Sequence, residues 1–292
     1  MALVLGIHIL VLEVLSLCNK VDKFNNLNSF KGKRKITMLT AYDYPTAKVL
    51  AQAGIDVLLV GDSLGMVVLG FSDTKSVTLD DMIRHTGAVV RGRDAAKKQV
   101  AGDNVEIGFK NETLVIADLP VQAVSTIGTA LRSARKLLEE TGADGVKVEG
   151  NPKIIQALRE AGVKVMGHTG LKPQQVEKNG VRGRDQVEAE SIFNESLEIE
   201  KAGAFAVVLE CVPPALTGRI TAAVNIPVIG IGAGKNCDGQ VLVSSDMLGL
   251  YNDFKPKFVR KYADFSEQIL ASAKQFIKDT ESGNFPSDKE SF

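Results

Sequence analysis

The stretch that decides the fold is residues 188–209, which read EAESIFNESLEIEKAGAFAVVL. Its first part, Glu188 to Ala202, has the apolar spacing of an amphipathic helix, and Gly203 follows it as a left-handed cap. Its last part, Ala206–Leu209, is a short aliphatic run without polar alternation, which is typical of a parallel strand buried on both faces. The stretch therefore predicts a helix, a short turn and a buried parallel strand.

The same construction recurs along most of the chain. Other helical patterns that end at a glycine cover residues 44–53, 78–91, 127–141 and 152–161. The predicted strands are Ile36–Ala41, Val57–Val60, Leu114–Ala117, Gly145–Val148, Val163–Met166, Ala206–Leu209, Val228–Ile231 and Val241–Ser244. Eight strands alternating with helices predict a single (β/α)8 TIM-type barrel, and a doubly wound sheet is the alternative that periodicity leaves open.

We predict one catalytic domain over residues 31–281. Residues 1–30 are an apolar N-terminal segment, in which Met1 to Leu17 predicts a helix packing on the barrel, with a degenerate targeting segment as the alternative. Phe258 to Lys278 predicts an extra C-terminal helix, and residues 282–292 predict a loosely ordered tail. Arg93 to Glu112 looks like a polar insertion at the end of the barrel away from the usual active face.

The composition excludes several kinds of partner. The 292 residues carry 35 basic and 35 acidic side chains, and no basic stripe predicts a contact with nucleic acid. No membrane partner is expected either, because the longest apolar run is short for a span and contains charge. The three cysteines are scattered and odd in number, which favours a reducing compartment. We expect a cytoplasmic protein, with a mitochondrial location left open.

Polar residues follow most of the predicted strands. In chain order they are Asp43, Asp62, Asp118, Glu149, His168 and Glu210. The carboxyl ends of barrel strands meet at one rim, where barrel enzymes place their active sites. Carboxylates that converge there repel one another unless a cation relieves them, and oxygen ligands favour a hard divalent ion. Any single acid can instead cap the next helix, as the helix start Tyr44-Pro45 after Asp43 indicates.

Three further side chains at this rim have competing interpretations. Lys147 shares a strand face with Glu149, so it binds a substrate oxygen, forms a Schiff base or neutralises Glu149. His168 is either a polar substrate contact or a structural histidine. Cys211 beside Glu210 is interpreted as a packing residue rather than a nucleophile.

A series of short motifs at these strand ends is similar to that of one known enzyme family. In order they are Thr40-Ala41-Tyr42-Asp43-Tyr44, Val60-Gly61-Asp62-Ser63-Leu64-Gly65-Met66, Ala117-Asp118-Leu119-Pro120, Val146-Lys147-Val148-Glu149-Gly150, Gly167-His168-Thr169-Gly170-Leu171, Leu209-Glu210-Cys211-Val212-Pro213 and Ile226-Pro227-Val228-Ile229-Gly230-Ile231-Gly232-Ala233-Gly234. From about Lys35 to the C-terminus, the chain thereby resembles the ketopantoate hydroxymethyltransferase family.

The resemblance implies a reaction, a cofactor and an assembly. The reaction is the transfer of a hydroxymethyl group from 5,10-methylenetetrahydrofolate to 3-methyl-2-oxobutanoate, which gives ketopantoate for pantothenate biosynthesis. The implied roles are Mg²⁺ binding for Asp62, Asp118 and Glu149, binding of the oxo acid for Asp62, Ser63, Asp118 and Lys147, general base catalysis for Glu210, and an additional contact for His168. The resemblance also implies a homo-oligomer, such as a decamer.

Three segments depart from the family pattern, and two other functions compete with it. The insertion Arg93 to Glu112 is longer than the family pattern. Leu171 to Arg184 is short and lacks a glycine-aromatic-lysine pattern, which puts folate contacts in question, and Val121 to Val124 replaces a more aromatic segment. The alternative enzyme is a magnesium-dependent 2-oxo-acid lyase or mutase of the phosphoenolpyruvate mutase type, whose Lys-Lys-Cys-Gly loop this sequence lacks. The alternative outside catalysis is a barrel that only binds a metabolite.

Overall fold

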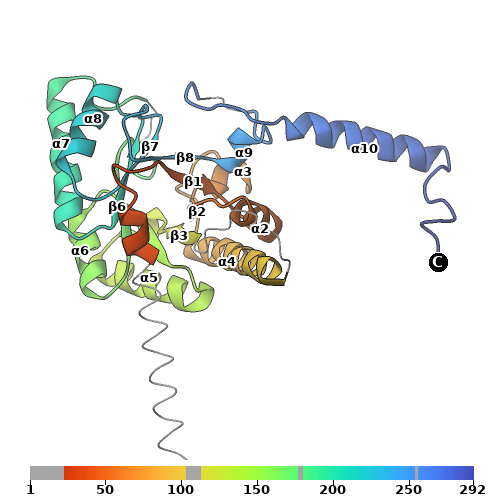
Figure 1. Cartoon of the computed structure of the whole chain (residues 1–292), viewed down its shortest axis with the longest axis horizontal. Coiled ribbons are helices and arrows are strands. Elements are labelled where there is room, and N and C mark those ends of the chain that lie inside the picture. Colours follow the sequence, from red (N-terminus) through yellow and green to blue (C-terminus); the bar gives the residue numbers. More distant parts are fainter. Residues whose placement is uncertain (1–22, 103–112, 177–179, 254–255) are drawn as a thin grey trace, which may run out of the picture. The chain divides into compact units, whose positions relative to one another are not determined.

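The eight strands form one closed parallel barrel. The computed structural model describes residues 23–102, 113–176, 180–253 and 256–292. Strands are hydrogen-bonded in the order β1 to β8 (Figure 1), and the backbone N–H of Ile36 donates to the carbonyl of Asp238 at 2.9 Å where the barrel closes. The strands are β1 Ile36–Thr40, β2 Val57–Val60, β3 Leu114–Asp118, β4 Gly145–Glu149, β5 Val165–Gly170, β6 Ala206–Glu210, β7 Val228–Ile231 and β8 Gly239–Leu242. The predicted (β/α)8 barrel is confirmed, and the doubly wound sheet is excluded.

Helices follow the strands and flank them on the outside (Figure 1). They are α2 Tyr44–Gln52, α3 Leu64–Val67, α4 Leu79–Gly102, the 3-10 helix η1 Val121–Val124, α5 Ile127–Thr141, α6 Pro152–Glu160, α7 Gln186–Lys201 and α8 Pro214–Ala223. Asp43 begins α2 as an N-cap, because its Oδ1 accepts a hydrogen bond from the backbone N–H of Thr46 at 2.8 Å. Asp43 is exposed and caps a helix, so it is a capping residue and not one of the buried acids inside the barrel.

Side chains alternate between the inside of the barrel and the layer beneath the helices. Val57 and Leu59 belong to the inner cluster, whereas Leu58 lies in the outer one. Because both layers exclude water, β2, β3 and β4 are buried at every position, as their uniform apolar runs predict. Residues 23–28 are helical and close the N-terminal end of the inner cluster, where the ring of Phe24 lies 4.7 Å from that of Phe205.

Two strands were predicted with the wrong bounds, whereas the other predicted strands agree to within one residue. β5 is Val165–Gly170 rather than Val163–Met166, because its polar end continues to pair with β4 and β6. β8 is Gly239–Leu242 rather than Val241–Ser244. A Cβ at Gly239 would lie 2.6 Å from the carbonyl oxygen of Ile36, so closure of the barrel needs a glycine at that point.

The end of the second helical pattern was also predicted wrongly. α4 does not stop at Gly92 but continues to Gly102, through half of the supposed insertion. A Cβ at Gly92 would lie 2.4 Å from the carbonyl oxygen of Tyr44 and 2.9 Å from Cβ of Ala47. Gly92 therefore allows α4 to pack closely on α2 and is not a cap. Residues 103–112 and the helix predicted for residues 1–17 lie outside the described residues.

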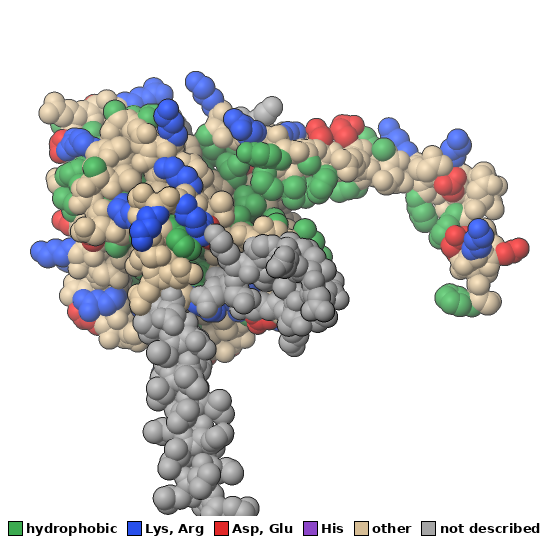
Figure 2. Space-filling view, viewed as in Figure 1, with side chains coloured by type: hydrophobic (Ala, Val, Ile, Leu, Met, Phe, Trp, Pro, Cys, Tyr) green, Lys and Arg blue, Asp and Glu red, His purple; other side chains and the backbone are tan. Residues whose placement is uncertain are grey.

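Leu242–Phe292 form a second compact unit. It contains α9 (Ser244–Met247) and α10, which spans Phe265–Glu281 rather than Phe258 to Lys278. None of the α10 residues is buried, and hydrophobic side chains gather along one side of this helix (Figure 2). In the predicted tail, the ring of Phe285 lies 5.5 Å from that of Phe276. Of the helices that the structure describes, none has the length and apolar character needed to span a membrane.

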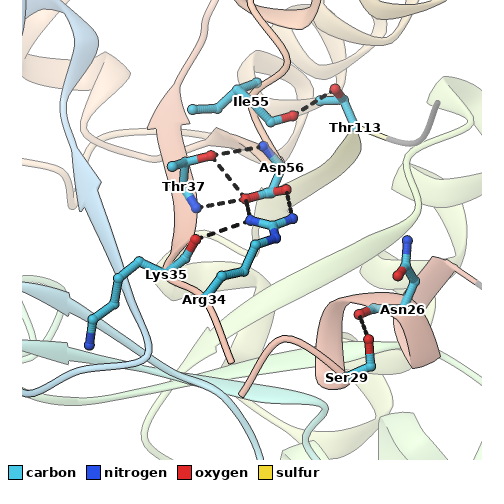
Figure 3. A network of polar contacts seen from close by, with 8 residues as sticks. All are labelled: Asn26, Ser29, Arg34, Lys35, Thr37, Ile55, Asp56 and Thr113. Atoms are coloured by element: carbon cyan, nitrogen blue, oxygen red, sulfur yellow. Dashed lines mark hydrogen bonds and ion pairs between the residues drawn. The ribbon is translucent and has the colours of Figure 1, made fainter. Parts of the chain in front are cut away.

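Charged side chains at the N-terminal rim of the barrel are paired. Asp56, directly before β2, accepts two hydrogen bonds from Arg34 at 2.6 and 2.7 Å (Figure 3). The backbone N–H and the hydroxyl of Thr37 donate to the same carboxylate at 2.8 and 2.9 Å. This network links the segment before β1 and the first residues of β1 to the start of β2. Asp56 therefore has its own basic partner at this rim, with which the acids of the opposite rim can be compared.

Candidate active site

Strand alternation brings five charged side chains into the barrel at its C-terminal rim. Residues two apart on a strand point to the same face, and each of these residues lies two positions after one that faces the inside of the barrel. The five are Asp118, Lys147, Glu149, His168 and Glu210. Asp62 lies in the turn after β2 and is also buried. The structure therefore places these six residues at one rim of the barrel.

Asp118 and Lys147 form a buried ion pair. Lys147 Nζ lies 2.5 Å from Asp118 Oδ1, and the two side chains are 5% and 3% exposed. Asp118 Oδ2 also accepts the backbone N–H of Asp62 at 3.0 Å. Burial alone would lower the pKa of Lys147, but the carboxylates of Asp118, Glu149 and Asp62 outweigh it and raise this pKa above its ordinary value. Lys147 is therefore a charged ammonium group, which favours electrostatic binding over a Schiff base.

His168 lies between two glutamates. Its Nδ1 is 3.4 Å from Glu149 Oε1, and its Nε2 is 3.4 Å from Glu210 Oε2. Burial would lower the pKa of His168, but the Glu149 carboxylate outweighs it and raises the pKa to about 9. Within the part of the chain that the structure describes, both ring nitrogens are buried without a well-formed hydrogen bond. The raised pKa favours the protonated ring of His168 between the two carboxylates, of which Glu210 is the more accessible at 18%.

Asp62 is the most perturbed acid of the site. Burial, followed by the charge of Asp118, raises its pKa well above the ordinary value. Its Oδ2 accepts a hydrogen bond from Gln174 Nε2 at 2.7 Å, a contact that the sequence did not predict. The neighbouring Ser63 begins α3, and its hydroxyl lies 2.8 Å from the hydroxyl of Tyr42.

The three predicted metal ligands fit a hard cation in donor type and charge. Asp62, Asp118 and Glu149 supply only carboxylate oxygens, and all three are buried. Their mutual repulsion, seen in the raised pKa of Asp62, is the kind that a divalent ion relieves. Among the described residues, no three acidic, imidazole or thiol groups lie close enough together to hold a metal ion. Asp118 accepts a hydrogen bond from Lys147, and Gln174 donates to both Asp62 and Glu149.

Cys211 has the properties of a packing residue. Burial, followed by the charge of Glu210, raises the pKa of its thiol to about 11. A thiol with so high a pKa is a poor nucleophile at neutral pH. This supports the interpretation of Cys211 made from the sequence.

A closed parallel barrel with buried acids and cations at its C-terminal rim defines an enzyme of the (β/α)8-barrel class. Within that class, the family model for ketopantoate hydroxymethyltransferase matches residues 22–288. The chain belongs to this family.

Relatives at the sequence level carry one name. The 3-methyl-2-oxobutanoate hydroxymethyltransferase of Acetivibrio thermocellus is 46% identical over 281 residues, which cover 93% of each chain. That of Enterococcus faecalis is 47% identical over 265 residues, or 88% of this chain and 90% of the relative.

Solved structures with similar folds have low sequence identity. A 2,3-dimethylmalate lyase of the phosphoenolpyruvate mutase and isocitrate lyase superfamily has a TM-score of 0.54 at 15% identity, with 92% of each chain covered. A phosphonopyruvate hydrolase in complex with oxalate and Mg²⁺ has a TM-score of 0.56 at 12% identity, covering 92% of this chain and 93% of its own. These likenesses establish a shared fold only.

Proposed function

We propose that this protein transfers a hydroxymethyl group from 5,10-methylenetetrahydrofolate to 3-methyl-2-oxobutanoate and forms ketopantoate, the first step of pantothenate biosynthesis. Membership of the family over residues 22–288 supports the reaction. The observation that carries the chemistry is that Lys147, His168 and Glu210 lie on three adjacent strands at one rim of the barrel. Enolisation of an oxo acid needs positive charge beside the substrate oxygens and a base beside the substrate carbon that loses the proton. Lys147 supplies the positive charge, and Glu210, with His168 beside it, supplies the base.

In this proposal Asp62, Asp118 and Glu149 hold Mg²⁺. Their burial, their oxygen donors and the raised pKa of Asp62 support this assignment. When bound, the ion supplies positive charge to the oxygen of an enolate.

The oxo acid is held by Lys147 together with Asp62, Ser63 and Asp118. The ammonium group of Lys147 attracts the carboxylate or keto oxygen of the substrate, and it is already oriented by its 2.5 Å contact with Asp118. Ser63 follows Asp62 directly and offers a hydroxyl group.

Glu210 takes the proton from C3 of the oxo acid. His168 Nε2 lies 3.4 Å from its Oε2, which fixes where the carboxylate of this base lies. We assign His168 a positioning role, in which it orients Glu210 and Glu149 from a shared imidazolium. Loss of the C3 proton leaves an enolate, and its carbon forms a bond to the one-carbon unit of the folate. Both bonds from that carbon to the folate nitrogens break, water supplies the hydroxyl oxygen, and tetrahydrofolate leaves.

The proposal also includes folate as the co-substrate, assembly as a homo-oligomer and a cytoplasmic location. These parts rest on the family relationship and on the composition of the chain. The shortened stretch 171–184 is the segment in which folate contacts need the most direct test.

The first experiment separates enolisation from transfer. Purified protein is incubated with 3-methyl-2-oxobutanoate in deuterated buffer, with and without Mg²⁺, and the C3 proton is followed by NMR. We expect exchange that requires Mg²⁺ and that falls by about 10²–10⁴-fold in Glu210→Gln. Glu198→Gln, an exposed glutamate of α7, is the matched control and should exchange like the wild type.

The outcomes discriminate between the competing functions. Addition of methylenetetrahydrofolate should then convert the oxo acid to ketopantoate, which the same spectra detect. Exchange without conversion would place the failure in folate binding. A folded, metal-loaded wild type that shows no exchange would overturn the proposed chemistry in favour of a barrel that only binds a metabolite.

A further inference from the structure

Gln174 contacts two of the site carboxylates at once. Its side-chain Nε2 donates to Asp62 Oδ2 at 2.7 Å, and its backbone N–H donates to Glu149 Oε2 at 3.0 Å. The same Nε2 also donates to the carbonyl oxygen of Leu119 at 3.1 Å. Gln174 is 5% exposed, so these bonds form away from water, where they are strongest.

The loop that carries Gln174 is hydrogen-bonded to the strand ends of the rim both before and after this residue. Before Gln174, the backbone N–H of Leu171 donates to the carbonyl of Glu210 at 2.9 Å. After it, Gln175 Nε2 donates to the carbonyl of Glu149 at 3.0 Å. Residues 171–175 therefore run from the end of β6 to the end of β4, and Gln174 reaches from there to the turn after β2. Such anchoring fixes where the two donors of Gln174 point.

We propose that Gln174 is a positioning residue of the metal site, which orients the carboxylates of Asp62 and Glu149. The inference rests on the proposed function, since it assumes that these carboxylates bind Mg²⁺. Each carboxylate uses one oxygen for Gln174, Oδ2 in Asp62 and Oε2 in Glu149. The second oxygen of Glu149, Oε1, lies 3.4 Å from His168 Nδ1. Groups that hold metal ligands in this way commonly set the affinity of the site.

Burial of the two carboxylates shows why such donors are needed. Asp62 and Glu149 are 6% and 3% exposed, so water cannot supply their hydrogen bonds. Gln174 supplies one donor to each of them. Loss of a donor leaves the carboxylate free to turn away from the orientation that a cation needs, which weakens cation binding.

The test measures metal binding directly. Mn²⁺ serves as the probe, and the free ion is counted by electron paramagnetic resonance in titrations of the full-length chain. We expect Gln174→Met, which keeps the size of the side chain, to raise the Kd for Mn²⁺ by about 10–100-fold. Gln174→Ala serves as a second variant in case the first disturbs the loop. Gln156→Met is the matched control, because this exposed glutamine of α6 donates its side-chain hydrogen bond to Glu160 of the same helix.

A second readout separates positioning from a merely structural role. If Gln174 acts through the metal site, saturating Mg²⁺ should return C3 exchange in Gln174→Met toward the wild-type rate. Unchanged or tighter Mn²⁺ binding in both Gln174 variants would overturn the inference, since tighter binding means that Gln174 competes with the metal. A wild type that binds no Mn²⁺ would instead overturn the metal site of the proposed function, and this inference with it.

Discussion

The two rims of the barrel differ in how their buried acidic side chains are neutralised. At the N-terminal rim, an aspartate stands directly before each of β2, β4 and β8, and each aspartate has its own basic partner. The pairs are Asp56 with Arg34, Asp144 with Arg93 and Asp238 with Lys31. At the C-terminal rim, four acids share Lys147 and His168. Charge is neutralised locally at one end and left in excess at the other.

The backbone contacts of the aspartates sharpen this contrast. Each of the three also accepts an N–H from the neighbouring strand, donated by Thr37, Val115 and Val228. The paired rim thus locks adjacent strand starts together. The excess charge of the other rim only weakens the fold unless a ligand uses it. Function is therefore expected at the end where electrostatic stabilisation is incomplete.

Lys147→Met should have the largest effect, because it removes charge from the rim that already has too little positive charge. We expect C3 exchange to fall by about 10²–10³-fold. The free energy of unfolding should fall by about 3–5 kcal/mol, since Asp118 is left buried without its partner. NMR exchange and urea unfolding measure the two quantities.

A surface lysine and a double variant control this result. Lys136→Met removes an exposed lysine that pairs with Asp80, and it should change neither quantity. Adding Asp118→Asn to Lys147→Met should restore stability, because no unpaired carboxylate is then left at this position. A stability that stays low in the double variant would mean that the loss in Lys147→Met does not come from the unpaired Asp118.

Arg93→Met tests the opposite rim with the same kind of loss. Arg93 lies 2.5 Å from Asp144, and each side chain is 6% exposed. The free energy of unfolding should fall by about 3–5 kcal/mol, while exchange per folded molecule stays at the wild-type level. Exchange is assayed at a temperature where circular dichroism shows the variant folded. Reduced exchange under those conditions would contradict the division of roles between the rims.

The same change, aspartate to asparagine, can be made at each rim, and its expected effects on stability are smaller but can be compared directly. Asp56→Asn should lower the free energy of unfolding by about 1.5 kcal/mol, because Arg34 and Thr37 lose a charged acceptor. Asp62→Asn should raise it in protein kept with a chelator, because Asp62 is a buried acid beside Asp118. Only the second variant should lose metal-dependent exchange. Destabilisation by Asp62→Asn in the metal-free protein would show that the site acids stabilise the fold.

The sequence predicted the features that depend on local periodicity. Uniform apolar runs predicted strands buried on both faces, and the spacing of Lys147 and Glu149 predicted that both face inward. Gln174 was not predicted, because a glutamine in a polar loop carries no local signal of burial. Only the closed barrel brings it to Asp62, a residue 112 positions earlier in the chain.

The paired rim was missed for a related reason. An aspartate before an apolar run is read as a turn residue, and its partner comes from a distant segment. Arg93 was assigned to a polar insertion because Gly92 was taken as the end of a helix. A residue without a side chain is needed at Gly92 because α4 packs closely on α2 at this position. Such a contact between two helices cannot be read from the hydrophobic periodicity of the sequence.

The smallest effect expected is the pH dependence of the paired rim. Burial raises the pKa of Asp56, but hydrogen bonds from Arg34 and Thr37 outweigh it, so the pKa lies below the ordinary 3.8. A carboxylate with a lowered pKa contributes stability that is present above the unfolded value and is lost as pH falls through the folded one. The difference in unfolding free energy between wild type and Asp56→Asn should therefore be the same at about pH 7 and pH 5 and smaller near pH 3. Urea unfolding at the three pH values measures it, and a constant difference would mean that the neutral hydrogen bonds, not the charge, stabilise this rim.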